Sequence, residues 1–125
     1  MNKKDKNREE IYKDMCARLL YEPMCRVTGD WFYDKLPPYD TPLNISILQR
    51  FKSGDCDVKL YLRELDFDPK KSMTYDEYGE YLKLLGVEIS TKGDLIEFFL
   101  KHHFDHRFLI PIKLALKAKK GMYTT

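Results

Sequence analysis

The sequence predicts an α+β fold in which a small antiparallel sheet packs against two or three helices. Alternating apolar and polar residues over residues 57–65 predict a strand with one buried face. Turn-forming residues between two β-favouring runs predict a hairpin at about 24–36. Apolar residues at helical spacing predict helices at about 8–20, 74–85 and 91–104.

The composition is that of one folded domain. The chain has 125 residues, of which 43% are hydrophobic and 14% aromatic, and disordered chains are poor in aromatic residues. We expect a disordered tail over residues 1–7, which are polar, and a single domain over residues 8–125. The three cysteines form no CxxC pair, the mostly charged first ten residues indicate no secretion signal, and no stretch approaches the ~20 apolar residues of a membrane span. These features predict a cytoplasmic protein without membrane contact.

The first helix is predicted to be amphipathic. Its inward positions are Ile11, Met15, Cys16 and Leu19, and Glu9, Glu10, Lys13 and Asp14 fall mostly on the outer face. Pro23 ends this helix, because a proline disfavours helical backbone in the residue before it.

The predicted hairpin places Met24–Val27 and Trp31–Asp34 on either side of a turn at residues 28–30. Three prolines then predict an extended, irregular connection over residues 37–42. Residues 45–51 fit a helix or a strand, and Asn44 favours a helix because its side chain can cap the N-terminus.

Two helices are predicted after the strand. Thr74 and Glu77 form a capping box at the start of the first helix, and Gly86 is expected to end it in a left-handed conformation. Its inward face would be Tyr75, Tyr78, Leu82 and Leu85. The second helix, capped by Ser90 or Thr91, is apolar almost all round and is expected to be the most buried element, with its apolar residues at Leu95, Ile96, Phe98, Phe99 and Leu100.

The densest group of polar side chains follows this last helix: His102, His103, Asp105, His106 and Arg107. If the helix continued, His102 and His106 would lie on one face at a spacing that can hold zinc. The glutamate of the HEXXH motif is absent and no third ligand is evident, so we predict no metal ligand, no cofactor and no catalytic residue. No nucleophile motif or phosphate-binding loop occurs in the chain.

A binding surface is the favoured hypothesis, because nine tyrosines are many for one small core and tyrosine and arginine are common in contact patches. The candidate binding residues are Tyr61, Arg63, His102, His103, Asp105 and Arg107. A protein partner or self-association fits them best. The uneven charge distribution, with six bases and one acid in residues 101–125, leaves nucleic acid or a nucleotide open as an alternative.

The same region carries a resemblance. Five segments resemble a family of small uncharacterised proteins of phages, prophages and mobile elements of Bacteroides-type bacteria: residues 59–63, His102–Asp105, Leu109–Ile110, Leu114–Ala115 and Gly121–Tyr123. The tails of that family read like HHFDYRGLI, LALEAP and GMY. The resemblance covers residues 59 to 123 and departs from the family pattern at His106, where tyrosine is usual, and at Phe108, where glycine is usual. It implies a phage accessory protein in a bacterial cytoplasm and no particular reaction.

These observations predict a non-enzymatic accessory protein that binds a host or phage macromolecule. One alternative is a counter-defence protein that sequesters a nucleotide signal with Arg63, Arg107, the tail lysines and stacking tyrosines. Another is a metal-dependent hydrolase built on His102 and His106. We also expect the C-terminal motif to act first as a structural clasp, since polar groups next to an apolar helix need partners when they are buried.

Overall fold

The computed structural model describes residues 3–29, 37–86 and 92–123. Its helices are α1 (Lys3–Arg18), α2 (Ile45–Lys52), α3 (Tyr75–Gly86) and α4 (Lys92–Lys101), and its strands are β1 (Met24–Thr28), β2 (Tyr39–Pro42), β3 (Asp57–Leu62) and β4 (Leu116–Lys117). The predicted α+β class is confirmed. Within these described ranges, no helix is both long and apolar enough to cross a lipid bilayer.

The sheet is mixed rather than purely antiparallel. Its strand order is β2-β1-β3-β4, with antiparallel pairs β2–β1 and β1–β3 and a parallel pair β3–β4. β4 pairs with β3 only through Tyr61↔Leu116 and Leu62↔Lys117. The parallel direction arises because the chain returns to β3 after a long excursion through α3 and α4, which a tight hairpin could not provide.

The partner of β1 differs from the predicted one. β1 pairs with residues 39–42, in the register Met24↔Pro42 to Val27↔Tyr39, where we expected an irregular connection. A proline is tolerated there because β2 is an edge strand, so the missing N–H at Pro42 breaks no bond to a further strand. The predicted second strand of the hairpin, Trp31–Asp34, lies outside the described residues.

Helix α1 begins at Lys3, within residues 1–7, for which we expected a disordered tail. Ile11 and Met15 are buried as predicted, but Cys16 is exposed. The face that packs inward is rotated toward Asp14 and Arg18, both of which are fully buried. An ion pair between these two side chains makes that rotation feasible, because a buried charge needs a partner.

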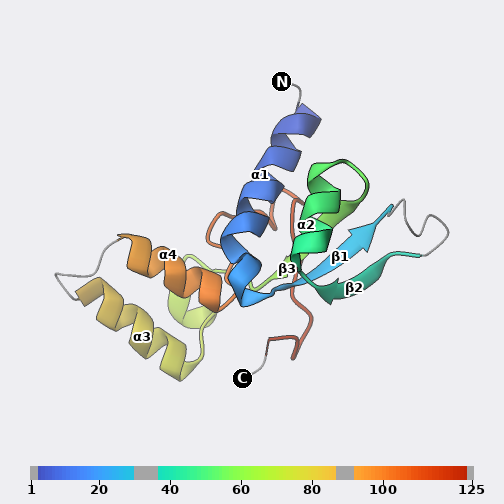
Figure 1. Cartoon of the computed structure of the whole chain (residues 1–125). Helices are drawn as coiled ribbons and strands as arrows, with labels where there is room; N and C mark the ends of the chain where they lie inside the picture. Colours follow the sequence, from blue (N-terminus) through green and yellow to red (C-terminus); the bar gives the residue numbers. More distant parts are fainter. Residues whose placement is uncertain (1–2, 30–36, 87–91, 124–125) are drawn as a thin grey trace.

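The main core lies between one face of the sheet and the helices α1 and α2, which both cover that face (Figure 1). Val58, Leu60 and Leu62 of β3 are turned into the core as predicted. Tyr61, on the other face, is also buried at 3% exposure, and β3 ends at Leu62 instead of residue 65. Helix α2 contributes Ile47, Leu48 and Phe51 to it. The predicted cap of α2 is confirmed, since the Asn44 side chain accepts a hydrogen bond from the Ile47 amide at 3.0 Å.

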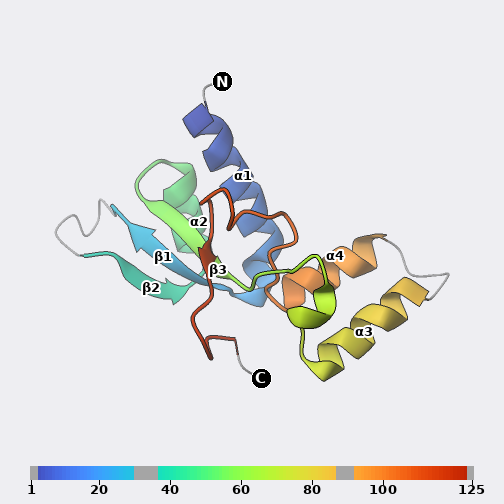
Figure 2. The ribbon, with the colours of Figure 1, turned by 180° about the vertical axis from the view of Figure 1, so that it is seen from behind.

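Helices α3 and α4 form a pair at the end of the molecule opposite to the β1–β2 strands, as Figures 1 and 2 both show. The capping box that starts α3 is confirmed: the Thr74 amide donates to Glu77 at 2.9 Å and the Glu77 amide donates to Thr74 Oγ1 at 3.2 Å. The predicted buried face of α3 is wrong, because Tyr75 is 93%, Leu82 49% and Leu85 56% exposed. Gly86 ends α3 without adopting a left-handed conformation.

Helix α4 is also less buried than its composition predicts. Phe98 is buried at 3% exposure, and Leu95, Ile96, Phe99 and Leu100 are only partly buried. The helix ends at Lys101, three residues earlier than predicted. Its aromatic side chains pack mainly within the pair, where Phe98 and Phe99 each contact Tyr81 of α3 with ring centroids 6.2 Å apart. The pair therefore forms a small side cluster rather than the centre of the core.

This arrangement predicts a strong asymmetry between two apolar residues of the helix pair. Phe98→Ala should lower the free energy of unfolding by about 3–5 kcal/mol, because it leaves a cavity among buried rings. Leu85→Ala, at a half-exposed position of α3, should cost less than about 1 kcal/mol. Urea denaturation of both variants would measure the difference, and equal losses would contradict the observed packing.

Candidate functional site

The predicted binding residues gather around the end of β3. Arg63 follows β3, and the C-terminal motif returns to it as a parallel bridge between Arg63 and Phe104. The Arg63 amide donates to the His103 carbonyl at 2.8 Å, and the Asp105 amide donates to the Arg63 carbonyl at 2.9 Å. Main-chain hydrogen bonds therefore attach the motif to the end of β3 independently of any side chain.

The Arg63 guanidinium binds other groups of the protein. Two of its nitrogens donate to the Glu77 carboxylate at 2.6 and 2.8 Å, and a third contact reaches the His102 carbonyl at 3.2 Å. The guanidinium also stacks over the Phe104 ring, 4.2 Å from its centroid. A paired, stacked arginine of this kind holds α3, β3 and the motif together and has little capacity left for a ligand.

Glu77 completes this cluster, and the sequence predicted it only as a capping residue. Its carboxylate accepts from Arg63 and from the Thr74 amide and lies 3.1 Å from His102 Nδ1. Burial by itself would raise the pKa of Glu77, but the hydrogen bonds from Arg63 and Thr74 and the nearby positive charge outweigh it and lower the pKa to about 2. The carboxylate is thus ionised throughout the physiological range.

Tyr123 lies beside Tyr61 and connects two strands of the sheet. Its hydroxyl donates to the Tyr61 carbonyl at 2.6 Å and accepts from the Met24 amide at 2.7 Å, so it bridges β1 and β3. The Tyr123 ring stacks on His103 with centroids 4.0 Å apart. The Tyr61 hydroxyl donates to Asp40 at 2.9 Å. This predicted binding residue is only 3% exposed.

Asp105 is 2% exposed and organises the loop that follows it. Its two carboxylate oxygens accept hydrogen bonds from the Leu109 amide at 2.8 Å and the Ile110 amide at 2.9 Å. Leu109 is thereby held against the core at 4% exposure. This geometry supports the clasp hypothesis for the motif, and a ligand contact of Asp105 stays a prediction.

Arg107 lies on the other side of the motif, apart from the Arg63 cluster. Its Nε is 3.7 Å from Asp14 Oδ1, beside the buried ion pair in which Arg18 donates to Asp14 at 2.9 Å. Arg18 also donates to the Phe104 carbonyl at 2.7 Å and to His106 Nδ1 at 3.3 Å. Sequence reasoning missed this centre, although the i,i+4 spacing of Asp14 and Arg18 was a signal for the pair.

The histidines do not form the arrangement that zinc would need. Because α4 ends at Lys101, His102 and His106 do not continue one helical face. His102 faces Glu77, whereas His106 lies beside the Arg18 guanidinium, a cation that would repel a metal ion. Among the residues that the structure describes, no group of three or more His, Cys, Asp or Glu side chains could hold a metal.

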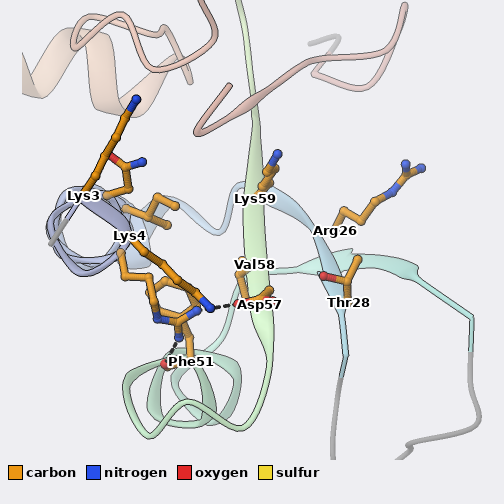
Figure 3. Close-up of a pocket in the computed structure, with 11 residues that line it drawn as sticks. Lys3, Lys4, Arg26, Thr28, Phe51, Asp57, Val58 and Lys59 are labelled. Carbon is orange, nitrogen blue, oxygen red and sulfur yellow. Dashed lines mark hydrogen bonds and ion pairs between the residues drawn. The ribbon is translucent and has the colours of Figure 1, made fainter. Parts of the chain in front are cut away.

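A second candidate surface lies away from the motif, between the N-terminal half of α1 and the sheet (Figure 3). We call it the basic groove; it has a volume of about 660 Å³, and its lining residues are Lys3, Lys4, Asn7, Arg8, Ile11, Arg26, Thr28, Phe51, Asp57, Val58 and Lys59. Five of these carry a positive charge and one a negative charge. Arg8 pairs with that single acid, Asp57, and its guanidinium covers the Phe51 ring at 4.1 Å.

The remaining cations of the groove are exposed to solvent. Arg26 pairs with Asp40 at 3.2 Å, whereas Lys3, Lys4 and Lys59 form no ion pair with any acid in the described ranges 3–29, 37–86 and 92–123. Figure 3 shows Lys3, Lys59 and Arg26 extending toward the same side from α1, β3 and β1. The groove therefore concentrates positive charge that the described acidic residues leave largely unpaired.

Comparisons with protein-family models, with curated proteins and with solved structures find no match to this chain. The function is therefore argued from the geometry of these surfaces.

The clasp predicts a measurable loss of stability at Asp105. Asp105→Ala should lower the free energy of unfolding by about 1–3 kcal/mol, because it leaves the Leu109 and Ile110 amides without their acceptor. Asp105→Asn, which keeps one carbonyl oxygen, should lose less. Wild-type melting temperatures for both variants would contradict a structural role.

Two partly buried histidines, His103 and His106, predict that stability falls in mild acid. Burial, together with Arg18, Arg63 and His102, lowers the pKa of His103 to about 4 from an ordinary 6.5, and burial and Arg18 lower that of His106. Because the unfolded chain binds these protons first, the stabilisation is complete above pH 6.5 and is lost as the pH falls toward 4. Thermal melts should show His103 alone contributing up to about 3 kcal/mol of this loss.

His103→Asn is the matched control for this pH dependence. Asparagine does not titrate, and it tolerates the left-handed backbone that residue 103 adopts, with φ of 62°. The variant should therefore lose part of the acid sensitivity. An unchanged pH profile would show that His103 is not the titrating group.

Proposed function

We propose that this protein is a non-enzymatic accessory protein of a phage or other mobile element, and that it binds an acidic segment of a partner protein in the basic groove. The observation that carries this proposal is a group of three lysines that line one cavity and form no ion pair with any described residue: Lys3, Lys4 and Lys59. The phage setting rests on the resemblance of the C-terminal motif.

Two features of the groove favour an acidic protein segment. The positive end of the α1 dipole adds to the charge of Lys3 and Lys4, which sit in its first turn. The lining contains one aromatic ring, Phe51, which is 2% exposed and covered by Arg8, so the groove lacks a stacking platform for the bases of a single strand. Carboxylates on a flexible segment match this surface better than a nucleic acid does.

The alternatives receive less support from the side chains assigned to them. A nucleotide-sequestering protein would need Arg63, Arg107 and the tail lysines for phosphates, but Arg63 is bound to Glu77, and Lys117 and Lys119 lie within ion-pair distance of Glu64 and Asp40. A metal-dependent hydrolase would need His102 and His106 together, and they face different partners.

Charge reversal in the groove tests the proposal. A fluorescent decaglutamate peptide should bind the wild-type protein, with an affinity that falls as salt rises, because exposed charges are screened. Lys59→Glu should weaken this binding by about tenfold, since it replaces an attraction with a repulsion. The control Lys83→Glu, on exposed α3 far from the groove, should bind as the wild type does.

Two results of this anisotropy titration would count against the proposal. One is an affinity for decaglutamate that is the same in the Lys59→Glu and Lys83→Glu proteins. The other is tighter binding of a single-stranded DNA of equal charge than of decaglutamate, which would assign the groove to nucleic acid.

A further inference from the structure

Two phenylalanine side chains stand together on the surface, remote in sequence from each other. Phe67 is 99% and Phe108 48% exposed, although apolar rings of this size are normally buried. Their ring centroids are 6.3 Å apart and their planes differ by 25°. Phe67 comes from the loop after β3, and Phe108 comes from the loop that Asp105 organises.

The two rings line a cavity of about 810 Å³, which we call the aromatic cleft. Its lining residues are Glu64, Leu65, Asp66, Phe67, Lys71, Ser72, Asp105, Phe108, Ile110 and Pro111. Three of these are acids and one is a base. The Asp105 carboxylate is used by two backbone amides, and one Asp66 oxygen accepts from the Asp68 amide at 2.9 Å. The acidic groups left for a ligand are the other Asp66 oxygen and Glu64, which is exposed and lies 3.6 Å from Lys117. The cleft thus combines exposed aromatic faces with negative charge.

The turn at Phe108 holds its ring at the surface. Its φ is 57°, in the left-handed region that glycine adopts freely and that is unusual for a bulky residue. Such a conformation persists where the surrounding structure holds it. Here the Phe108 amide donates to the Asp105 carbonyl at 3.2 Å, and the Asp105 carboxylate accepts from the next two amides. The turn therefore leaves Phe108 48% exposed.

We propose that the aromatic cleft binds an arginine side chain of a partner protein. A guanidinium is flat, stacks on aromatic faces and forms paired hydrogen bonds with carboxylates. To lie between two rings it needs a separation of about 7 Å, twice a carbon contact distance. The two ring centroids are 6.3 Å apart and the ring planes differ by 25°. The Phe67 side chain is almost wholly exposed, so it is free to move until the gap between the two faces reaches that separation.

The charge of the cleft selects among aromatic-binding ligands. Glu64 and Asp66 repel the phosphates of a nucleic acid, and the exposed pair of Glu64 with Lys117 at 3.6 Å offsets little of this charge. A lysine ammonium can pair with the acids but does not present a flat face to both rings. The aromatic cleft shares no lining residue with the basic groove, so this inference does not depend on the proposed function.

An NMR titration of the full chain tests the proposal. The probe is a blocked pentapeptide, Gly-Gly-Arg-Gly-Gly, compared with the same peptide carrying lysine or citrulline in place of arginine. The arginine peptide should shift the amides of residues 64–67 and 108–110 in a saturable way. The lysine peptide should bind more weakly, and the neutral citrulline peptide about tenfold more weakly than the arginine peptide.

Three variants make the result specific. Phe67→Ala should weaken arginine-peptide binding at least about fivefold. Phe108→Gly should weaken it similarly while leaving the melting temperature unchanged or higher, since glycine relieves the left-handed backbone. Tyr75→Ala removes an equally exposed aromatic ring, 93% exposed on α3, and should bind as the wild type does.

Equal affinity of wild type, Phe67→Ala and Phe108→Gly for the arginine peptide would overturn the proposal, as would equal affinity for arginine and citrulline. The occupant would also be wrong if the protein formed a concentration-dependent dimer that Phe67→Ala dissociates and the arginine peptide does not. Light scattering of both proteins over a range of concentrations would detect that second copy.

Discussion

The ion pair between Asp14 and Arg18 connects the helical layer to the C-terminal half of the chain. Both side chains have no exposure to solvent, and a buried pair is costly unless its remaining hydrogen-bonding capacity is used. Arg18 uses part of it on the Phe104 carbonyl and on His106, which ties the chain after α4 to α1. Arg18 Nη1 and Asp14 Oδ1 make no hydrogen bond within the described residues, and Arg107 lies 3.7 Å from that Asp14 oxygen. Helix α4 ends at Lys101, and the motif then runs beside β3. There the main chain of His103 and Asp105 forms hydrogen bonds with the main chain of Arg63.

This connection explains why the most conspicuous polar motif is largely structural. The charged and aromatic groups of the motif meet partners within the protein: Arg63 meets Glu77, Asp105 meets two backbone amides, and His103 meets Tyr123. Groups satisfied in this way stabilise one conformation of the tail, and they have little left to offer an external ligand. Polar residues that cluster in a sequence are therefore a poor guide to a binding surface until their internal partners are known.

The surfaces that remain for recognition carry charged side chains without an ion pair among the described residues, or apolar side chains exposed to solvent. The basic groove leaves three lysines without an ion pair within the described part of the chain, and the aromatic cleft leaves two phenylalanine rings in water. Their charges are opposite, and they are built from different segments, so the two surfaces can serve different contacts of one partner or of two. Helix α3 exposes further apolar residues, Tyr75, Leu82 and Leu85.

Features whose hydrogen bonds form within a few residues were predictable from the order of the amino acids alone. The Asn44 cap and the Thr74–Glu77 capping box were readable because each side chain bonds an amide three residues away, and β3 was readable from its alternation. Tertiary structure decided the rest: the pairing of β1 with residues 39–42, the burial of Asp14 and the exposure of α3. Burial and strand pairing depend on which segments, distant in the sequence, pack against a residue. Here the C-terminal segment supplies the Phe104 carbonyl as a partner for the buried Arg18. No described segment covers the outer face of α3.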